Sequence, residues 1–190
     1  MENRLTEISV NQAKLCIMRG DITRQATEAI VNAANSGLMG GGGVDGAIHR
    51  VGGPAILEEC KQIVSRQGRL PAGQAVMTTG SNLEAKYVIH TVGPIWYGGE
   101  KGESGLLASA YRESLKLAVE NKLASISFPS ISTGAYGYPV SEAAKIALET
   151  VASFLLEKAT SLKVVVFVLF DERTFCVYSD ALHEIAVSET

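Results

Sequence analysis

Short runs of apolar, β-favouring residues alternate along this chain with segments whose apolar residues recur at helical spacing. The runs predict strands at Leu15–Met18, Ala29–Val31, Ala75–Met77, Tyr87–Ile89, Ile126–Phe128 and Val164–Phe170. Helical spacing is shown by Leu107, Tyr111, Leu115 and Ala118, and again by Ala143, Ile146, Ala147, Val151, Phe154 and Leu155. Alternation of this kind predicts an α/β domain with helices on both faces of a sheet.

Residues that start or stop helices refine this pattern. Pro54 suits the first turn of a helix that Gly68 ends, and Ser104 and Ser141 are predicted N-caps of later helices. The last helix contains His183.

Length and composition indicate one soluble domain. A chain of 190 residues is long enough to bury one core, so we expect residues 1–190 to form a single domain. The hydrophobic fraction of 46% and the charged fraction of 19% are ordinary for a globular protein. A net charge of −3 argues against a broad nucleic-acid surface.

The cysteines and the N-terminus bear on location. Cys16, Cys60 and Cys176 are scattered and form no Cys-x-x-Cys pair, so we expect neither a disulfide framework nor a zinc cluster. The first residues lack the apolar core of a signal peptide. Val164–Phe170, the longest apolar run, is far shorter than the roughly 20 residues of a membrane span. We therefore expect a cytoplasmic protein without a membrane partner.

Four consecutive glycines, Gly40–Gly43, are the strongest functional signal. Each glycine costs roughly 1 kcal/mol relative to alanine in a helix and packs no side chain, so the run indicates a need for bare backbone. Backbone N–H groups before a helix N-terminus are typical of phosphate binding. A second loop, Pro129–Pro139, also follows a predicted strand and is rich in hydroxyls and glycines. Two such loops predict a diphosphate between them.

Familiar nucleotide motifs do not account for the glycines. Gly41, Gly43 and Gly46 satisfy G-x-G-x-x-G, but the pattern does not directly follow its strand, and Arg66 stands near the place of the expected acidic residue. No Gly-Lys-Ser/Thr ends the run, so a P-loop is not supported either. The sequence therefore favours neither hydride transfer nor ATP hydrolysis.

Five segments together resemble the macrodomain family, most closely its MacroD-type branch. They are Gly20–Thr23, Ala29–Asn35, Gly40–His49, Tyr87–Pro94 and Ile131–Pro139. The resemblance implies a three-layer α/β/α domain with a central mixed sheet, which binds ADP-ribose in a surface cleft.

The resemblance also implies roles for individual residues. Asp21 would accept a hydrogen bond from the adenine amino group, with the Ile22 backbone beside it and Phe170 stacked on the ring. Asn35 would orient the distal ribose, and Asp45 would hold or activate the attacking water. His49 matches a residue near the same place. The residues around the diphosphate would be Gly41, Gly42, Gly43, Val44, Ser132, Thr133, Gly134, Ala135 and Tyr136.

Purely structural interpretations of the polar residues stay open at this point. Asp21 could be only a cap or turn residue, and Asn32 and Asn35 could be turn formers, since asparagine tolerates positive φ. Asp45, just before Gly-Ala-Ile-His, is a good N-cap candidate.

The histidines and Phe170 also have structural alternatives. His49 could be an ordinary helix-face histidine, and Phe170 could be plain core. His90, in a predicted strand, and His183 look structural. Because an unperturbed Asp has a pKa of about 3.9, Asp45 suits positioning and polarising a water, with the ligand's diphosphate assisting proton transfer.

The leading hypothesis is a hydrolase that removes single ADP-ribose units ester-linked to Asp or Glu side chains and deacetylates O-acetyl-ADP-ribose. Its partners would be ADP-ribose, ADP-ribosylated proteins and O-acetyl-ADP-ribose, and it would need neither a metal nor a cofactor. The alternative is a reader that binds ADP-ribose without turnover. Recognition of RNA or of ADP-ribose phosphate has less support, given the acidic balance.

Two other branches of the family fit less well. The branch that cleaves polymeric ADP-ribose has a Gly-Gly-Gly run followed by Gln-Glu-Glu, whereas this chain has only Glu58-Glu59 after Gly52-Gly53. The zinc-dependent branch needs clustered Cys and His ligands, which this sequence does not supply.

Overall fold

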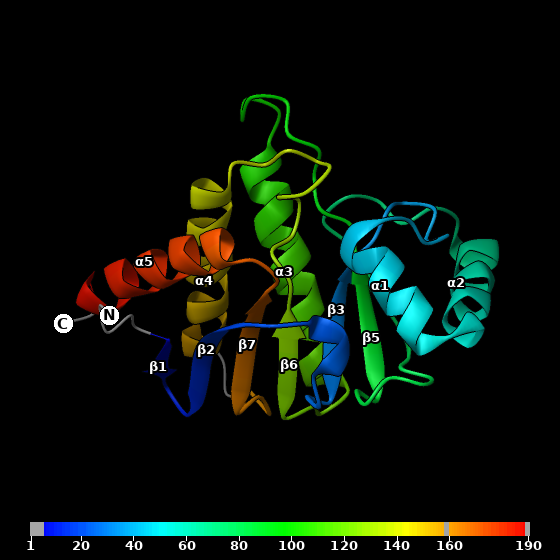
Figure 1. Ribbon diagram of the computed structural model, residues 1–190, viewed down its shortest axis with the longest axis horizontal. Coiled ribbons are helices and arrows are strands. Elements are labelled where there is room, and N and C mark those ends of the chain that lie inside the picture. Colours follow the sequence, from blue (N-terminus) through cyan, green and yellow to red (C-terminus); the bar gives the residue numbers. More distant parts are fainter. Residues whose placement is uncertain (1–5, 158–159, 189–190) are drawn as a thin grey trace.

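A computed structural model describes residues 6–157 and 160–188 of the protein. In these ranges, a seven-stranded sheet has the order β1-β2-β7-β6-β3-β5-β4 (Figure 1). Strands β2, β7, β6, β3 and β5 are parallel, and the edge strands β1 and β4 pair antiparallel with β2 and β5. The strands are β1 (Glu7–Val10), β2 (Ala13–Arg19), β3 (Ala29–Ala33), β4 (Ala75–Thr79), β5 (Tyr87–Thr91), β6 (Ser125–Phe128) and β7 (Val164–Leu169).

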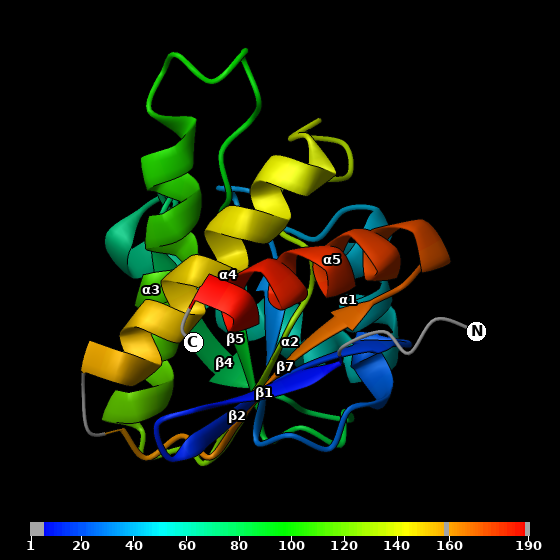
Figure 2. The same cartoon turned by 90° about the vertical axis from the view of Figure 1, so that its left-hand side faces the viewer.

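Helices cover both faces of this sheet. One face carries α1 (Gly43–Gly52), α2 (Pro54–Gln67) and the short 3-10 helix η1 (Ile22–Arg24). The other face carries α3 (Glu103–Glu120), α4 (Val140–Glu157) and α5 (Glu172–Ser188). Figure 2 views the sheet from its β1 edge and shows the three layers. The α/β/α fold with a central mixed sheet that the sequence predicted is confirmed.

The central strands are apolar on both sides because both sides are covered. Along β3, Ile30 packs in the core beneath α1 and α2, whereas the next residue, Val31, packs in the core beneath α3, α4 and α5. Ile48 of α1 and Ile56 of α2 are fully buried against the first side. This burial fixes the loops that follow the strands.

Buried aromatic residues support the loop after β6. Phe128 and Phe167 stack with their ring centroids 5.6 Å apart, and Tyr111 packs on both. The Tyr111 hydroxyl accepts a hydrogen bond from the N–H of Ile131 at 3.1 Å, and the Tyr178 hydroxyl donates to Oγ of Ser130 at 2.9 Å. The core thus holds the first residues of that loop from below.

Every predicted strand is present, with ends that differ by one or two residues, and β1 was missed because its four residues show little apolar character. The predicted helix from Pro54 is confirmed and ends at Gln67 with Gly68 as its C-cap. In the described part of the chain, no helix has the length and apolar character that crossing a membrane would require.

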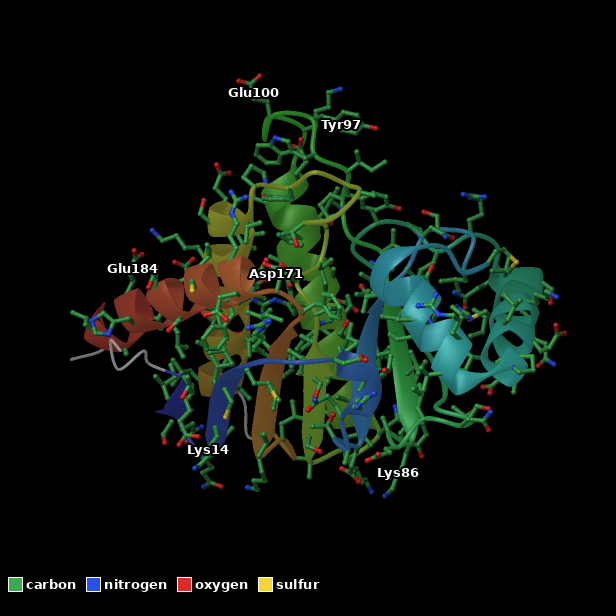
Figure 3. All side chains as sticks on the ribbon, viewed as in Figure 1. Lys14, Lys86, Tyr97, Glu100, Asp171 and Glu184 are labelled. Atoms are coloured by element: carbon green, nitrogen blue, oxygen red, sulfur yellow. The ribbon has the colours of Figure 1, made fainter. Side chains whose placement is uncertain are left out.

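Two predicted N-caps are wrong. The helix α3 begins at Glu103 with Gly102 as its N-cap, and α4 already includes Ser141, since it begins at Val140. The Glu103 carboxylate accepts hydrogen bonds from the N–H groups of Tyr97, Gly99 and Lys101, so it folds the preceding loop back onto the helix start. Figure 3 labels Tyr97 and Glu100 at the far end of this loop.

Candidate functional site

The two loops predicted to hold a diphosphate follow neighbouring parallel strands. The strand β3 leads into residues 34–42, and β6 leads into residues 129–139, which we call the first loop and the second loop. Ala29 of β3 pairs with Ile126 of β6. Because the carboxyl ends of parallel strands lie at the same edge of the sheet, both loops emerge at that edge (Figure 1).

The glycines of the first loop leave its backbone open. Gly40 has φ +79°, and Gly43, the first residue of α1, has φ +57°, a region that favours glycine. A Cβ on Gly46 would lie 2.5 Å from the carbonyl oxygen of Gly41, so only glycine lets the loop pack this close to the helix. A Cβ on Gly42 or Gly43 would meet nothing within 4 Å. Their open backbone lies at the positive end of the α1 dipole, which suits an anion.

The second loop contains a residue under backbone strain. Ser132 has φ +66°, which costs a non-glycine residue on the order of 1–3 kcal/mol. Its hydroxyl is buried without a hydrogen-bond partner in the described residues. A Cβ on Gly93 would lie 2.1 Å from that hydroxyl oxygen, so Gly93 makes room for it. Gly134 is exposed, and a Cβ there would also meet nothing within 4 Å.

The remaining loop residues predicted at the diphosphate lie around these glycines. Thr133 is half-buried, and its hydroxyl donates to Oγ of Ser130 at 2.8 Å. Ala135 is exposed, and the carbonyl of Tyr136 accepts from the N–H of Trp96 at 2.9 Å. Val44, in the first turn of α1, is half-buried.

Asp45 is not the N-cap of α1. The N-cap is Gly42, and Asp45 is the third residue of the helix and only 5% exposed. Its Oδ1 accepts a hydrogen bond from Nδ2 of Asn32 at 2.8 Å and lies 3.3 Å from Nε2 of His49. Its Oδ2 lies toward the first loop, since a Cβ on Gly41 would be 3.2 Å from it. One carboxylate oxygen is therefore held by the protein, and the other faces the glycines.

Neither asparagine has positive φ. The turn-former alternative is wrong for Asn32 but holds for Asn35, whose carbonyl accepts a hydrogen bond from the N–H of Leu38 at 3.0 Å. Asn32 lies within β3 and is fully buried. Asn35 lies in the first loop, half-buried, and its Nδ2 donates to the carbonyl of Gly40 at 2.8 Å. Asn35 therefore braces the glycine run, and its Oδ1 is not used by that bond.

His90 was interpreted as structural, yet it contacts this group. It is fully buried in β5, opposite Asn32 in the strand register, and its Nδ1 lies 3.1 Å from Nδ2 of Asn32. Its Nε2 lies 2.9 Å from Oγ1 of Thr78. Burial, together with the nearby His49 ring, lowers the pKa of His90 to about 3. In the sequence, this contact could have been suspected only from two polar residues, Asn32 and His90, that each follow a run of apolar residues within a strand.

The residues predicted around adenine are brought together by the pairing of β2 with β7. Arg19 pairs with Leu169, and the N–H of Gly20 donates to the Leu169 carbonyl at 2.9 Å. Asp21 therefore begins its turn beside Phe170. Phe170 is 82% exposed, so the core alternative is wrong for it. Asp171, the next residue, is labelled at the end of β7 in Figure 3.

Asp21 is the N-cap of η1, as its structural interpretation predicted. Its Oδ1 caps η1 by accepting from the N–H of Thr23 at 2.9 Å and from the Thr23 hydroxyl at 2.7 Å. The Thr23 hydroxyl is the main reason why the pKa of Asp21 is lowered. Ile22 follows, with its side chain buried. Both bonds use Oδ1, so capping leaves Oδ2 for another donor.

One cavity lies beside the two loops, and another lies away from them. One of about 280 Å³ is lined by Ser36, Ile95 and Tyr136 among others, so it adjoins both loops. A cavity of about 370 Å³ between α4 and α5 contains none of the predicted site residues. Across residues 6–157 and 160–188, no three His, Cys, Asp or Glu side chains gather as a metal ion would require.

Fold and site together define an α/β/α domain with two glycine-containing loops and a buried aspartate at the carboxyl edge of its sheet. The family model described as "Macro domain" matches residues 31–147. The chain belongs to the Macro domain family.

Relatives and solved structures agree with this assignment. A macro domain-containing protein of Caldanaerobacter subterraneus subsp. tengcongensis is 59% identical over 172 residues, which cover 90% of this chain and 97% of the relative. An O-acetyl-ADP-ribose deacetylase of Klebsiella pneumoniae is 54% identical over 162 residues, which cover 85% of this chain and 92% of that enzyme. The structure of the Oceanobacillus iheyensis macrodomain with ADP matches with a TM-score of 0.92 and 45% identity, covering 96% of this chain and 97% of that one.

A more distant structure is also similar. The Trypanosoma brucei macrodomain in complex with ADP-ribose matches with a TM-score of 0.82 and 41% identity, over 88% of this chain and 68% of that one.

Proposed function

We propose that the protein is an ADP-ribose-binding hydrolase that cleaves esters of the distal ribose. Its substrates would be O-acetyl-ADP-ribose and proteins that carry mono-ADP-ribose on Asp or Glu side chains. The relatives named O-acetyl-ADP-ribose deacetylase support the first substrate, and both substrates are acyl esters of the same sugar. The free, scattered cysteines favour a reducing, cytoplasmic setting.

The observation that carries this proposal is the orientation of the Asp45 carboxylate. Its Oδ1 is held by Asn32 and lies near His49, while Oδ2 lies toward Gly41 at the edge of the glycine run. A diphosphate bound by the open backbone of Gly42, Gly43 and Gly134 would set the attached sugar beside Oδ2.

In this proposal, adenine contacts Asp21 and the Ile22 backbone and stacks on Phe170. The diphosphate lies against Gly41, Gly42, Gly43 and Val44 on one side and Ser132, Thr133, Gly134, Ala135 and Tyr136 on the other. Asn35 orients the distal ribose, and His49 supports the Asp45 carboxylate.

The chemical step is attack of water on the acyl carbon. Oδ2 of Asp45 accepts a hydrogen bond from that water and polarises it, and the water oxygen forms the new bond to the carbonyl carbon. The bond from that carbon to the ribose oxygen breaks, and the ribose oxygen leaves with a proton, which the diphosphate helps to transfer. Positioning of water and ester supplies most of the rate gain, so this residue set requires no metal.

Two measurements test the proposal. Purified protein is incubated with O-acetyl-ADP-ribose and with a glutamate-linked mono-ADP-ribosylated protein, and released ADP-ribose is quantified. Calorimetry measures the affinity for ADP-ribose. Turnover of either ester together with binding is the expected result. Binding without turnover would instead favour a reader module, and no binding would refute both.

A further inference from the structure

A line of buried polar side chains passes beneath the candidate site. Thr78 in β4, His90 in β5, Asn32 in β3 and Asp45 in α1 are 3%, 0%, 0% and 5% exposed. In the sheet, β3 lies next to β5 and β5 next to β4, so the strand order sets the sequence of contacts. Burying four polar groups is costly unless they form hydrogen bonds with one another. Each of these bonds needs one donor and one acceptor, so the positions of the protons have to be assigned.

The geometry allows one assignment of the protons. Nδ2 of Asn32 lies 2.8 Å from Oδ1 of Asp45 and 3.1 Å from Nδ1 of His90. An amide nitrogen only donates, so both of those atoms must accept. If the amide were turned over, its oxygen would face the carboxylate oxygen, and two acceptors would meet.

The rest of the chain of bonds follows from this assignment. With Nδ1 unprotonated, the His90 proton is on Nε2, which donates to Oγ1 of Thr78 at 2.9 Å. The Thr78 hydroxyl in turn donates to the carbonyl of Thr79 at 3.0 Å. Each bond in this line has one donor and one acceptor. Nε2 of His90 also lies 3.8 Å from Sγ of Cys60, and Oδ1 of Asn32 is buried without a partner among the described residues.

We propose that His90 is a positioning residue for the hydrolysis assigned above: its unprotonated Nδ1 holds the Asn32 amide, so that Nδ2 presents its second hydrogen to Asp45. This inference rests on the proposed function of Asp45. A protonated Nδ1 would be a donor facing a donor, and the amide would lose its orientation. Burial keeps the ring neutral by lowering its pKa to about 3, so the acceptor is present at neutral pH.

The effect on Asp45 is geometric. Asn32 and His49 approach the same oxygen of Asp45, and this leaves the other oxygen directed toward Gly41. A carboxylate released from Asn32 can tilt, and a displacement of about 1 Å in a positioned group is enough to cost roughly 100-fold in rate. His90 itself touches no substrate in this scheme.

Two substitutions of similar size separate positioning from packing. In His90→Asn, the side-chain oxygen takes the place of Nδ1 and can still accept from Asn32. In His90→Gln, the terminal amide reaches the place of Nε2 and faces Thr78 instead. We expect His90→Asn to keep kcat within about threefold and His90→Gln to lower it at least tenfold, with KM and the ADP-ribose Kd unchanged in both.

Thr78→Val is the matched control, because it breaks the network on the far side of His90 and leaves the Asn32 bond in place. Thermal unfolding first shows that each variant is folded. Equal losses of kcat in all three variants, or a loss of ADP-ribose affinity parallel to kcat, would overturn the proposal in favour of general packing.

A measurement on the unmodified protein needs no variant. Nitrogen-15 NMR of histidine side chains should show His90 with a bare Nδ1 and a protonated Nε2 throughout pH 5–8. The opposite tautomer or an imidazolium would overturn the proposal even if every variant failed to fold. If the protein hydrolysed neither ester, the proposed function would fail and this inference with it, whereas a wrong tautomer in an active enzyme would remove only the role of His90.

Discussion

Asn32 and Asp45, 13 positions apart in the chain, are joined by a 2.8 Å hydrogen bond from the Asn32 amide nitrogen to Oδ1 of the carboxylate. The bond links a central strand to the first turn of α1, directly beside the glycine run. It gives the two oxygens of Asp45 different surroundings, one inside the protein and one toward the open backbone of the first loop.

Asp45→Asn should abolish most turnover and leave ligand binding intact. The amide keeps the volume of the side chain, and its oxygen can still accept from Asn32, so the fold should persist. Removing a residue that activates water lowers kcat by roughly 10²- to 10⁴-fold. Steady-state kinetics with O-acetyl-ADP-ribose measures this, and calorimetry should find the ADP-ribose Kd changed by less than about threefold. Glu120→Gln, at the exposed C-terminal end of α3, is the control.

Phe170→Ala should weaken binding of ADP-ribose without loss of stability. The ring is 82% exposed, so its removal should change the free energy of unfolding by less than about 0.5 kcal/mol. Stacking of a base on an aromatic ring contributes roughly 1–3 kcal/mol, which corresponds to about 5- to 150-fold in Kd. Calorimetry of the variant and of Phe170→Tyr, which keeps the stacking face, checks the effect. Equal affinities of all three proteins would refute the adenine position.

Gly46→Ala should damage the first loop through the backbone. The new methyl group would lie 2.5 Å from the Gly41 carbonyl oxygen, so either the helix or the loop must move. Overpacking of this kind costs about 1–3 kcal/mol. Urea denaturation should show this loss, and affinity for ADP-ribose should fall with it because the loop is displaced.

Two further glycines make the comparison specific. Gly134→Ala meets no neighbouring atom within 4 Å, so it should leave stability unchanged but place a methyl group where the diphosphate is proposed to bind. Gly105→Ala lies equally free in the first turn of α3, outside both loops, and should raise stability by up to about 1 kcal/mol with binding unaffected. A Gly134→Ala protein that binds ADP-ribose normally would contradict the second loop's role.

Local patterns were sufficient for the layers of the fold and for the two loops. The apolar runs that became β3 and β6 were visible in sequence, and the loops after them could be placed at one sheet edge because parallel strands end together. The short edge strand β1 was not visible, because Glu7, Ile8, Ser9 and Val10 carry too few apolar residues to stand out.

Contacts between side chains on different strands were beyond such patterns. Asp45 in sequence looks like an N-cap, yet in the structure α1 begins two residues earlier, at Gly43, with Gly42 as its cap. The pairing of Asn32 with His90 depends on the register of β3 against β5, which no local signal specifies. The predictions for Asp21, Asn35, His49 and Phe170 as ligand contacts remain to be tested.

Acid should destabilise the protein through His90. Its pKa is about 3 in the folded state against 6.5 for the free side chain, so between these values the unfolded chain binds a proton that the folded protein does not. The contribution of His90 to stability is therefore fully present above pH 6.5 and falls by up to about 1.4 kcal/mol per pH unit between pH 6.5 and pH 3. The His90 ring is fully buried, with His49, Asn32 and Cys60 as its neighbours. Burial also raises the pKa of the Cys60 thiol to about 11, so this neighbour carries no charge at neutral pH.

His90→Asn isolates this contribution from that of other titrating groups, because it removes the imidazole but keeps an acceptor for Asn32. From pH 7 to pH 5, the wild-type free energy of unfolding should fall by roughly 2 kcal/mol more than that of His90→Asn in parallel urea titrations. The excess loss has this sign because protonating the buried ring would place an uncompensated charge against Asn32. Equal pH dependence in the two proteins would mean that the pKa of His90 is not lowered by folding, so that the buried ring takes up a proton without unfolding the protein.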